Sequence, residues 1–139
     1  SEQPTLVNTP KVFQSQRGLR MSEVEGIYTA YLTGAAGQGM AMFVFKDGKI
    51  AGADIAGLTF SGDYEIKSSQ MVGKVSYRMP AGSVAITGAS FEQGSDNIIV
   101  PISLPEKIDP NETYRVDTPI GPLNAKFLKN VSFGENDAD

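Results

Sequence analysis

The chain has 139 residues, which suits one domain large enough to bury a core. It contains no cysteine and no histidine, which excludes disulfides, thiolate chemistry and the usual general base near neutral pH. Its net charge of −4 argues against bulk attraction to nucleic acid or to an anionic membrane surface.

The ends of the chain differ from its middle. No apolar run approaches the roughly 18 residues of a membrane span, and the N-terminus lacks the apolar core of a signal peptide, so we expect a cytoplasmic protein. Residues 1–20 have no sustained hydrophobic period, which predicts an extension outside the domain, mobile or draped over it. We expect residues 21–133 to form a single domain and residues 134–139 to form an acidic tail.

Alternation of apolar and polar residues predicts a strand at residues 24–33, followed by a glycine-rich turn. The next strand, at residues 39–46, is apolar on both faces, so both faces should be covered. One face can line a barrel interior, whereas the other needs a partner subunit, a helix or the N-terminal extension. We assign four large side chains of this strand to a candidate dimer or cover face: Met40, Met42, Phe43 and Phe45.

Two hairpins are expected around the middle of the chain. The dipeptide Asp47-Gly48 is a strong hairpin signal, because both central residues of such a turn need positive φ, and it leads into a strand at residues 49–55. Residues 58–67 show the cleanest alternation, and Ser68-Ser69 turns them into a strand at residues 71–79. A slip of one residue between these strands would turn their apolar side chains to water, so we expect a fixed register.

The next stretch is less regular. Residues 84–86 suggest a short strand, residues 90–96 a loop and residues 97–104 a further strand. Pro101 cannot donate to a ladder, which places that strand at an edge or a bulge.

A last pair of strands, at residues 113–118 and 123–131, brings the total to eight or nine short strands joined mostly by tight turns. Such a meander tends to close, because closure removes exposed edges. We therefore predict an all-β fold: an eight-stranded antiparallel up-and-down barrel, lipocalin-like, with at most one or two short helical turns. A barrel of eight strands is either filled by its side chains or able to hold one small ligand.

No catalytic constellation stands out. The serines have no histidine to activate them, and Asp63 and Glu65 lie on a strand face that we expect to be solvated. Asp54, among glycines, is either the cap of its own turn or a buried acid in a cavity. We expect no enzyme activity, no cofactor and no metal.

Aromatic and methionine side chains on the predicted inward faces are the main candidates for a site. They form either plain core or an apolar cavity whose methionines adapt to a guest. The candidate cavity lining consists of Tyr28, Phe60, Tyr64, Met71, Tyr77, Met79 and Phe127.

Several short motifs resemble the GrlR-like family, whose members restrain the master regulator of type III secretion in enterocyte-effacing bacteria. The resemblance covers residues 25–74 best and consists largely of turn glycines and their neighbours. The motifs are Gly26-Ile27-Tyr28, Lys46-Asp47-Gly48-Lys49, Gly52-Ala53-Asp54, Phe60-Ser61-Gly62-Asp63-Tyr64 and Leu123-Asn124-Ala125-Lys126-Phe127.

The resemblance implies a small antiparallel β-barrel with an apolar interior, a tendency to dimerise and no enzyme activity. It also implies sequestration of a transcription activator through an acidic surface loop. That loop would follow Tyr64, where this chain has Lys67, Ser68, Ser69 and Gln70 and no acidic run. No residue of this chain is therefore assigned that role.

Two functions are consistent with these observations. The first is a non-enzymatic regulatory protein that acts as a homodimer and binds a protein partner of the transcription-activator type. The alternative is a barrel that binds a small apolar ligand. In neither case do we expect direct contact with nucleic acid or membrane.

Overall fold

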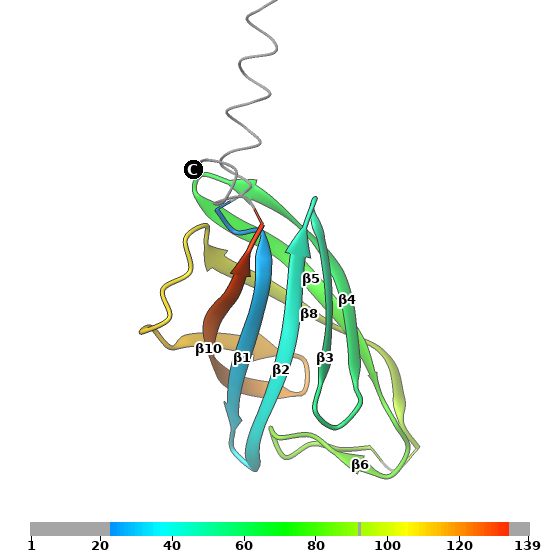
Figure 1. The fold of residues 1–139 in the computed structure, drawn as a ribbon. Coiled ribbons are helices and arrows are strands. Elements are labelled where there is room, and N and C mark those ends of the chain that lie inside the picture. Colours follow the sequence, from blue (N-terminus) through cyan, green and yellow to red (C-terminus); the bar gives the residue numbers. More distant parts are fainter. Residues whose placement is uncertain (1–22, 92, 134–139) are drawn as a thin grey trace, which may run out of the picture.

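The computed structural model describes residues 23–91 and 93–133, and within them the chain forms ten strands and no helix. Eight strands form one antiparallel sheet in the order β8-β5-β4-β3-β2-β1-β10-β9, while β6 and β7 form a separate hairpin (Figure 1). The strands are β1 Gly26–Gly34, β2 Gly37–Lys46, β3 Lys49–Asp54, β4 Thr59–Lys67, β5 Gln70–Met79, β6 Ser83–Val84, β7 Ser90–Phe91, β8 Ser95–Pro105, β9 Tyr114–Thr118 and β10 Gly121–Ser132.

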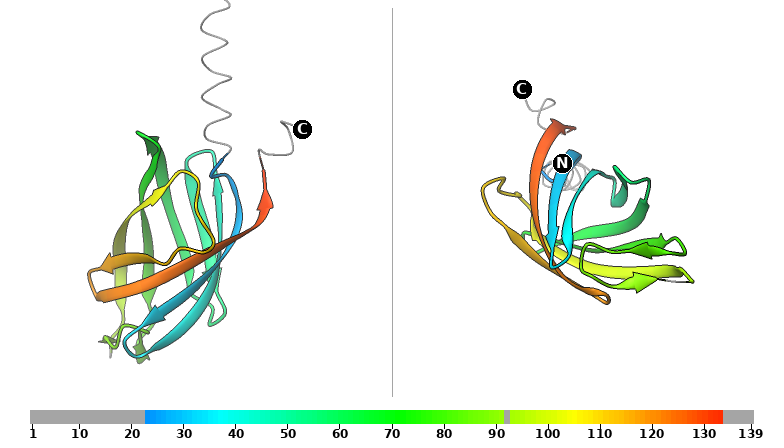
Figure 2. Two further views of the ribbon diagram at one scale, coloured as in Figure 1. Left: turned by 90° about the vertical axis from the view of Figure 1, so that its left-hand side faces the viewer. Right: turned by 90° about the horizontal axis from the view of Figure 1, so that it is seen from below.

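The eight-stranded sheet curls into a nearly closed barrel (Figure 2). β1 to β5 are consecutive neighbours, β8 pairs with β5, and β10 returns to pair with β1. β8 and β9 are the two edges of the sheet and approach each other without a ladder; we call this line the seam. The predicted eight-stranded antiparallel barrel is thus confirmed, and Pro101 lies on an edge strand, as expected of a residue without an N–H group.

Two tight turns set the register of the long hairpins. Asp47 and Gly48 have φ values of 52° and 78°, and Ser68 and Ser69 have φ values of 51° and 66°. Positive φ at both central residues matches the right-handed twist of the flanking strands. The β2–β3 and β4–β5 ladders then run without a register shift, which fixes the side chains that face the interior.

The prediction of a loop at residues 90–96 is wrong, because this stretch contains β7 and the start of β8. The sequence gives no periodic signal for β7, since the strand has two residues and pairs only with the equally short β6. The N-terminal extension and acidic tail predicted at residues 1–20 and 134–139 lie outside the described residues.

The assignment of Phe43 and Phe45 to a cover face is also wrong. Both side chains face the barrel interior, where Phe45 is only 2% exposed. Successive side chains on a strand alternate between faces, so Met40 and Met42 lie on the outer surface, 37% and 49% exposed. Tyr31 of β1 lies beside Met40 on this outer face and is exposed as well.

The two ends of the barrel are built differently. One end carries the β2–β3 and β4–β5 turns and is packed with large side chains; we call it the filled end. The opposite end carries the β1–β2, β3–β4 and β9–β10 turns together with the β6–β7 hairpin, at the bottom of Figure 1, and we call it the hollow end. The largest completely buried side chains of the filled end are Tyr28, Phe45, Met71 and Val24.

Candidate functional site

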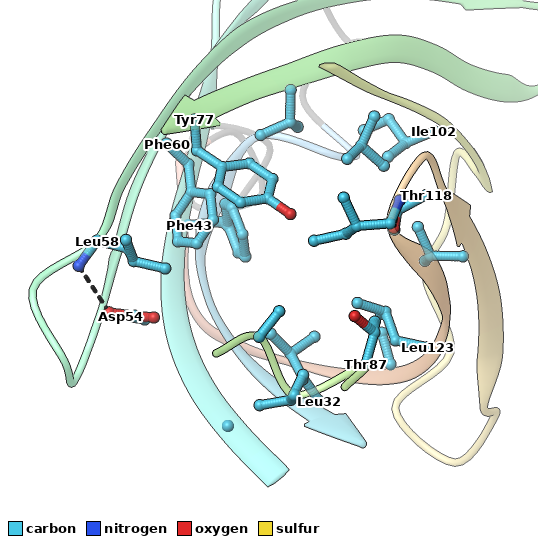
Figure 3. Close-up of a pocket in the computed structure, with 18 of the residues that line it drawn as sticks. Leu32, Phe43, Asp54, Leu58, Phe60, Tyr77, Thr87, Ile102, Thr118 and Leu123 are labelled. Atoms are coloured by element: carbon cyan, nitrogen blue, oxygen red, sulfur yellow. Dashed lines mark hydrogen bonds between the residues drawn. The ribbon is translucent and has the colours of Figure 1, made fainter. Parts of the chain in front are cut away.

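A cavity of about 750 Å³ occupies the hollow end of the barrel. Figure 3 looks into it and shows lining side chains from all eight strands of the large sheet and from the β6–β7 hairpin. Most of the lining residues are apolar, and the margin of the cavity reaches the seam at Ser103 and Arg115. Sites for small organic molecules typically have volumes of about 300–1,000 Å³.

On two neighbouring strands, β2 and β3, the inward side chains become smaller toward the hollow end, which leaves room for the cavity. On β2 the inward residue changes from Phe45 to Ala41 and then to Gly39. On β3 it changes from Ile50 to Gly52. The barrel diameter is set by the number of strands, so smaller side chains leave space unfilled.

Three aromatic rings form one wall of the cavity. The ring centroids of Phe43 and Phe60 are 5.3 Å apart, and those of Phe60 and Tyr77 are also 5.3 Å apart. Gly52 lies opposite both Phe43 and Phe60 in the ladders. A Cβ atom at Gly52 would lie 2.7 Å from a ring carbon of Phe43, so glycine is what allows the two rings to meet across β3.

The β6–β7 hairpin supplies another part of the wall. The Ala36 amide donates a hydrogen bond to the Ile86 carbonyl at 2.7 Å, which joins the hairpin to the β1–β2 turn. Glycine permits this approach, because a Cβ atom at Gly34 would lie 2.5 Å from the same carbonyl oxygen. Ile86 and Thr87 of the hairpin both line the cavity.

Asp54 takes the first of the two roles that the sequence left open, because it caps its own turn and is only half-buried. Its Oδ1 accepts hydrogen bonds from the amides of Ala56 and Leu58 at 3.0 and 2.8 Å, which is an Asx-type turn. The half-buried side chain also lines the cavity next to Leu58 (Figure 3). The carboxylate is therefore held at the cavity margin by backbone donors of its own turn.

Among the described residues, the other charged groups of the lining form an ion pair at the seam. Arg115 Nε lies 2.9 Å from Asp117 Oδ1, and both side chains are largely exposed. The Tyr77 hydroxyl, by contrast, points into the cavity (Figure 3). Burial raises the pKa of Tyr77 above its usual value, so this hydroxyl stays protonated at neutral pH.

The predicted lining residues separate into two groups. Those at the cavity are Phe60, Tyr77, Met79 and Phe127. Those that pack in the core of the filled end instead are Tyr28, Tyr64 and Met71. Strand alternation identifies inward positions, but it does not tell which end of a barrel is filled, and this accounts for the difference.

Sequence analysis did not assign Leu32, Thr87, Ile102, Thr118 or Leu123 to a site, yet all five line the cavity (Figure 3). Leu32, Ile102 and Leu123 occupy inward positions of predicted strands, so alternation could have identified them. Thr87 lies in a hairpin turn without any hydrophobic period, and no signal in the sequence marks it.

The acidic residues give no support for a metal site. Within the part of the chain that the structure describes, no group of three or more acidic side chains could hold a metal ion. Asp63 and Glu65 are exposed, as predicted, and Glu65 lies 3.9 Å from Lys67. Residues 23–91 and 93–133 also contain no helix with the length and apolar character needed to cross a membrane.

Comparisons of this chain with models of known protein families, with curated proteins and with solved structures find no significant match. The resemblance to the GrlR-like family therefore stays a prediction.

Proposed function

We propose that this protein binds a small apolar molecule in the cavity at the hollow end. The supporting observation is a cavity of about 750 Å³ that is lined mainly by aliphatic and aromatic side chains. Side chains that border empty space lose the dispersion contacts that a packed core provides, and a bound guest would restore them. The volume lies within the range of about 300–1,000 Å³ that is usual for small-molecule sites.

Two substitutions on β8 test the proposal. Ile102 lines the cavity, whereas Ile99 on the same strand is 48% exposed outside the barrel. Ile102→Trp should fill the cavity and abolish binding of the neutral, environment-sensitive dye Nile red, while Ile99→Trp should retain it. Circular dichroism checks that both variants are folded. Equal dye binding by the two variants, or no dye binding by the unaltered protein, would refute the proposal.

A milder variant covers the case in which tryptophan disrupts folding. Leu32→Phe adds volume inside the cavity and should weaken dye binding. Ligand binding should also raise the melting temperature, because a ligand at 100 times its Kd stabilises the folded state by about 2.7 kcal/mol. For a domain of this size such a gain corresponds to a shift on the order of 10 °C.

The regulatory role and the homodimer stay predictions. They depend on the outer face formed by β10, β1 and β2, where large apolar side chains are exposed, and exposed patches of this kind can mark interaction sites. The exposed residues are Tyr31, Met40, Met42, Leu128 and Val131. Light scattering tests the dimer: Met42→Glu should convert it to a monomer, and a monomeric unaltered protein would count against it.

A further inference from the structure

We propose that the ligand of this cavity is uncharged and carries an oxygen atom that hydrogen bonds to the Tyr77 hydroxyl. This inference rests on the proposed function and narrows the ligand class. The ligand would be a lipophilic alcohol, ketone or ester, and neither a carboxylate nor an amine.

The charges at the cavity argue against a charged ligand. Within the described residues the charged lining groups are Asp54, Arg115 and Asp117. Oδ1 of Asp54 accepts hydrogen bonds from two amides of its own turn at the cavity margin, and Arg115 is paired with Asp117 at the exposed seam. Beyond this margin a ligand charge would be surrounded mostly by apolar side chains, and burial of an unpaired charge is strongly unfavourable.

Tyr77 offers a neutral polar group in the interior. Its ring packs against Phe60, with centroids 5.3 Å apart, which fixes the direction of the side chain. The hydroxyl points into the cavity, and no hydrogen bond joins it to the other residues drawn in Figure 3. A tyrosine hydroxyl is a donor at neutral pH, and burial raises the pKa of Tyr77 further above that range. A ligand oxygen placed there would accept a hydrogen bond from this hydroxyl beside the apolar lining.

Competition among three ligands of equal chain length tests the charge requirement. Decan-1-ol, decanoate and decylammonium are each used to displace Nile red from the unaltered protein at pH 7.5. We expect decan-1-ol to displace the dye at a concentration at least about tenfold lower than either ion, because only the alcohol enters without burying a charge. Equal or better displacement by an ion would overturn the inference.

A conservative pair of substitutions tests the hydrogen bond. Tyr77→Phe removes the hydroxyl inside the cavity, and Tyr31→Phe removes a hydroxyl from the outer face of β1. Tyr77→Phe should weaken decan-1-ol binding by about three- to tenfold, the usual effect of one hydrogen bond. Tyr31→Phe should leave it unchanged. Unchanged binding in Tyr77→Phe would remove this residue from the site.

Two further variants distinguish a cationic from an anionic ligand if the ligand is charged after all. Asp54→Asn keeps an oxygen acceptor for the turn but removes its charge, and Arg115→Gln removes the cation at the seam. Preferred binding of decylammonium that is lost in Asp54→Asn, or of decanoate that is lost in Arg115→Gln, would show a charged ligand. In both cases dye binding persists, so the proposed function would stand. Absence of dye binding in the unaltered protein would instead refute both the proposed function and the inference about the ligand class.

Discussion

At the filled end of the barrel Tyr28 and Met71 are almost completely buried, whereas at the hollow end Leu32 and Phe60 are only partly buried and border a cavity. Both ends use the same eight strands, so neither the topology nor the hydrogen-bonded ladder explains the difference. On β2 and β3 the difference lies in the size of the inward side chains. Glycine and alanine on β2 and β3 take the places that phenylalanine and isoleucine occupy at the other end.

The filled end of the barrel thus provides stability, and the hollow end provides the space that the proposed ligand needs. The filled end supplies most of the buried apolar contacts and holds the strands in place. The hollow end can then leave inward apolar groups unpacked without loss of the fold. A site supported by a rigid scaffold keeps its shape while it is empty, which reduces the ordering cost of binding.

The sharpest test of this division is truncation of one large side chain at each end. Met71→Ala should destabilise the protein by about 2–5 kcal/mol, because it opens a void in a packed core. Leu32→Ala should cost less than about 2 kcal/mol, because this partly buried side chain already faces a cavity. Urea unfolding measures both. Similar losses for the two variants would show that the hollow end is packed as tightly as the filled end.

A smaller effect is expected at the place where the two ends join. Gly52→Ala would put a Cβ atom 2.6 Å from the Met42 carbonyl oxygen and 2.7 Å from the Phe43 ring. We expect a loss of about 1–3 kcal/mol, since overpacking forces neighbouring atoms apart. Dye binding should weaken as well, because Phe43 lines the cavity.

The matched control for Gly52→Ala is on the same strand. Ala53 is exposed on the outer face of β3, so Ala53→Ser should change stability by no more than about 0.5 kcal/mol. Urea unfolding and dye titration of both variants decide the matter. A neutral Gly52→Ala would mean that β3 shifts to accommodate the extra carbon and that the contact between Phe43 and Phe60 does not depend on glycine.

Much of the barrel was predictable because its long strands alternate cleanly. The two-residue period of residues 58–67 and the Asp47-Gly48 turn fix strand, register and inward face from local physics alone. The decrease in side-chain size from Phe45 to Gly39 was also present in the sequence, but it points to the hollow end only once the inward face of β2 is known.

Other features depend on contacts between distant segments. The β6–β7 hairpin packs against the β1–β2 turn through the hydrogen bond from Ala36 to Ile86, and no local pattern in the sequence predicts that these two residues meet. Phe43 and Phe45 were misplaced because β2 is apolar on both faces, so composition could not separate the interior from the surface. Only closure of the sheet decides which face is inside.

The smallest expected effect concerns two tyrosines of the filled end. Tyr28 donates a hydrogen bond to the Val24 carbonyl at 2.8 Å, whereas the buried Tyr64 hydroxyl finds no hydrogen-bond partner within residues 23–91 and 93–133. Tyr28→Phe should therefore cost about 1 kcal/mol at pH 7. Tyr64→Phe should be neutral or slightly stabilising, because it removes an unsatisfied buried group.

Alkaline pH provides the companion measurement. Burial raises the pKa of Tyr64 to about 12, above its value of about 10 in an unfolded chain. The folded state thus holds this proton more tightly, so its contribution to stability is complete below pH 10 and is lost as the pH rises toward 12. The urea midpoint should fall across this window, and it should fall less in Tyr64→Phe. If that variant lost stability as steeply as the unaltered protein, ionisation elsewhere would control alkaline unfolding, and burial of the Tyr64 hydroxyl would have no thermodynamic consequence.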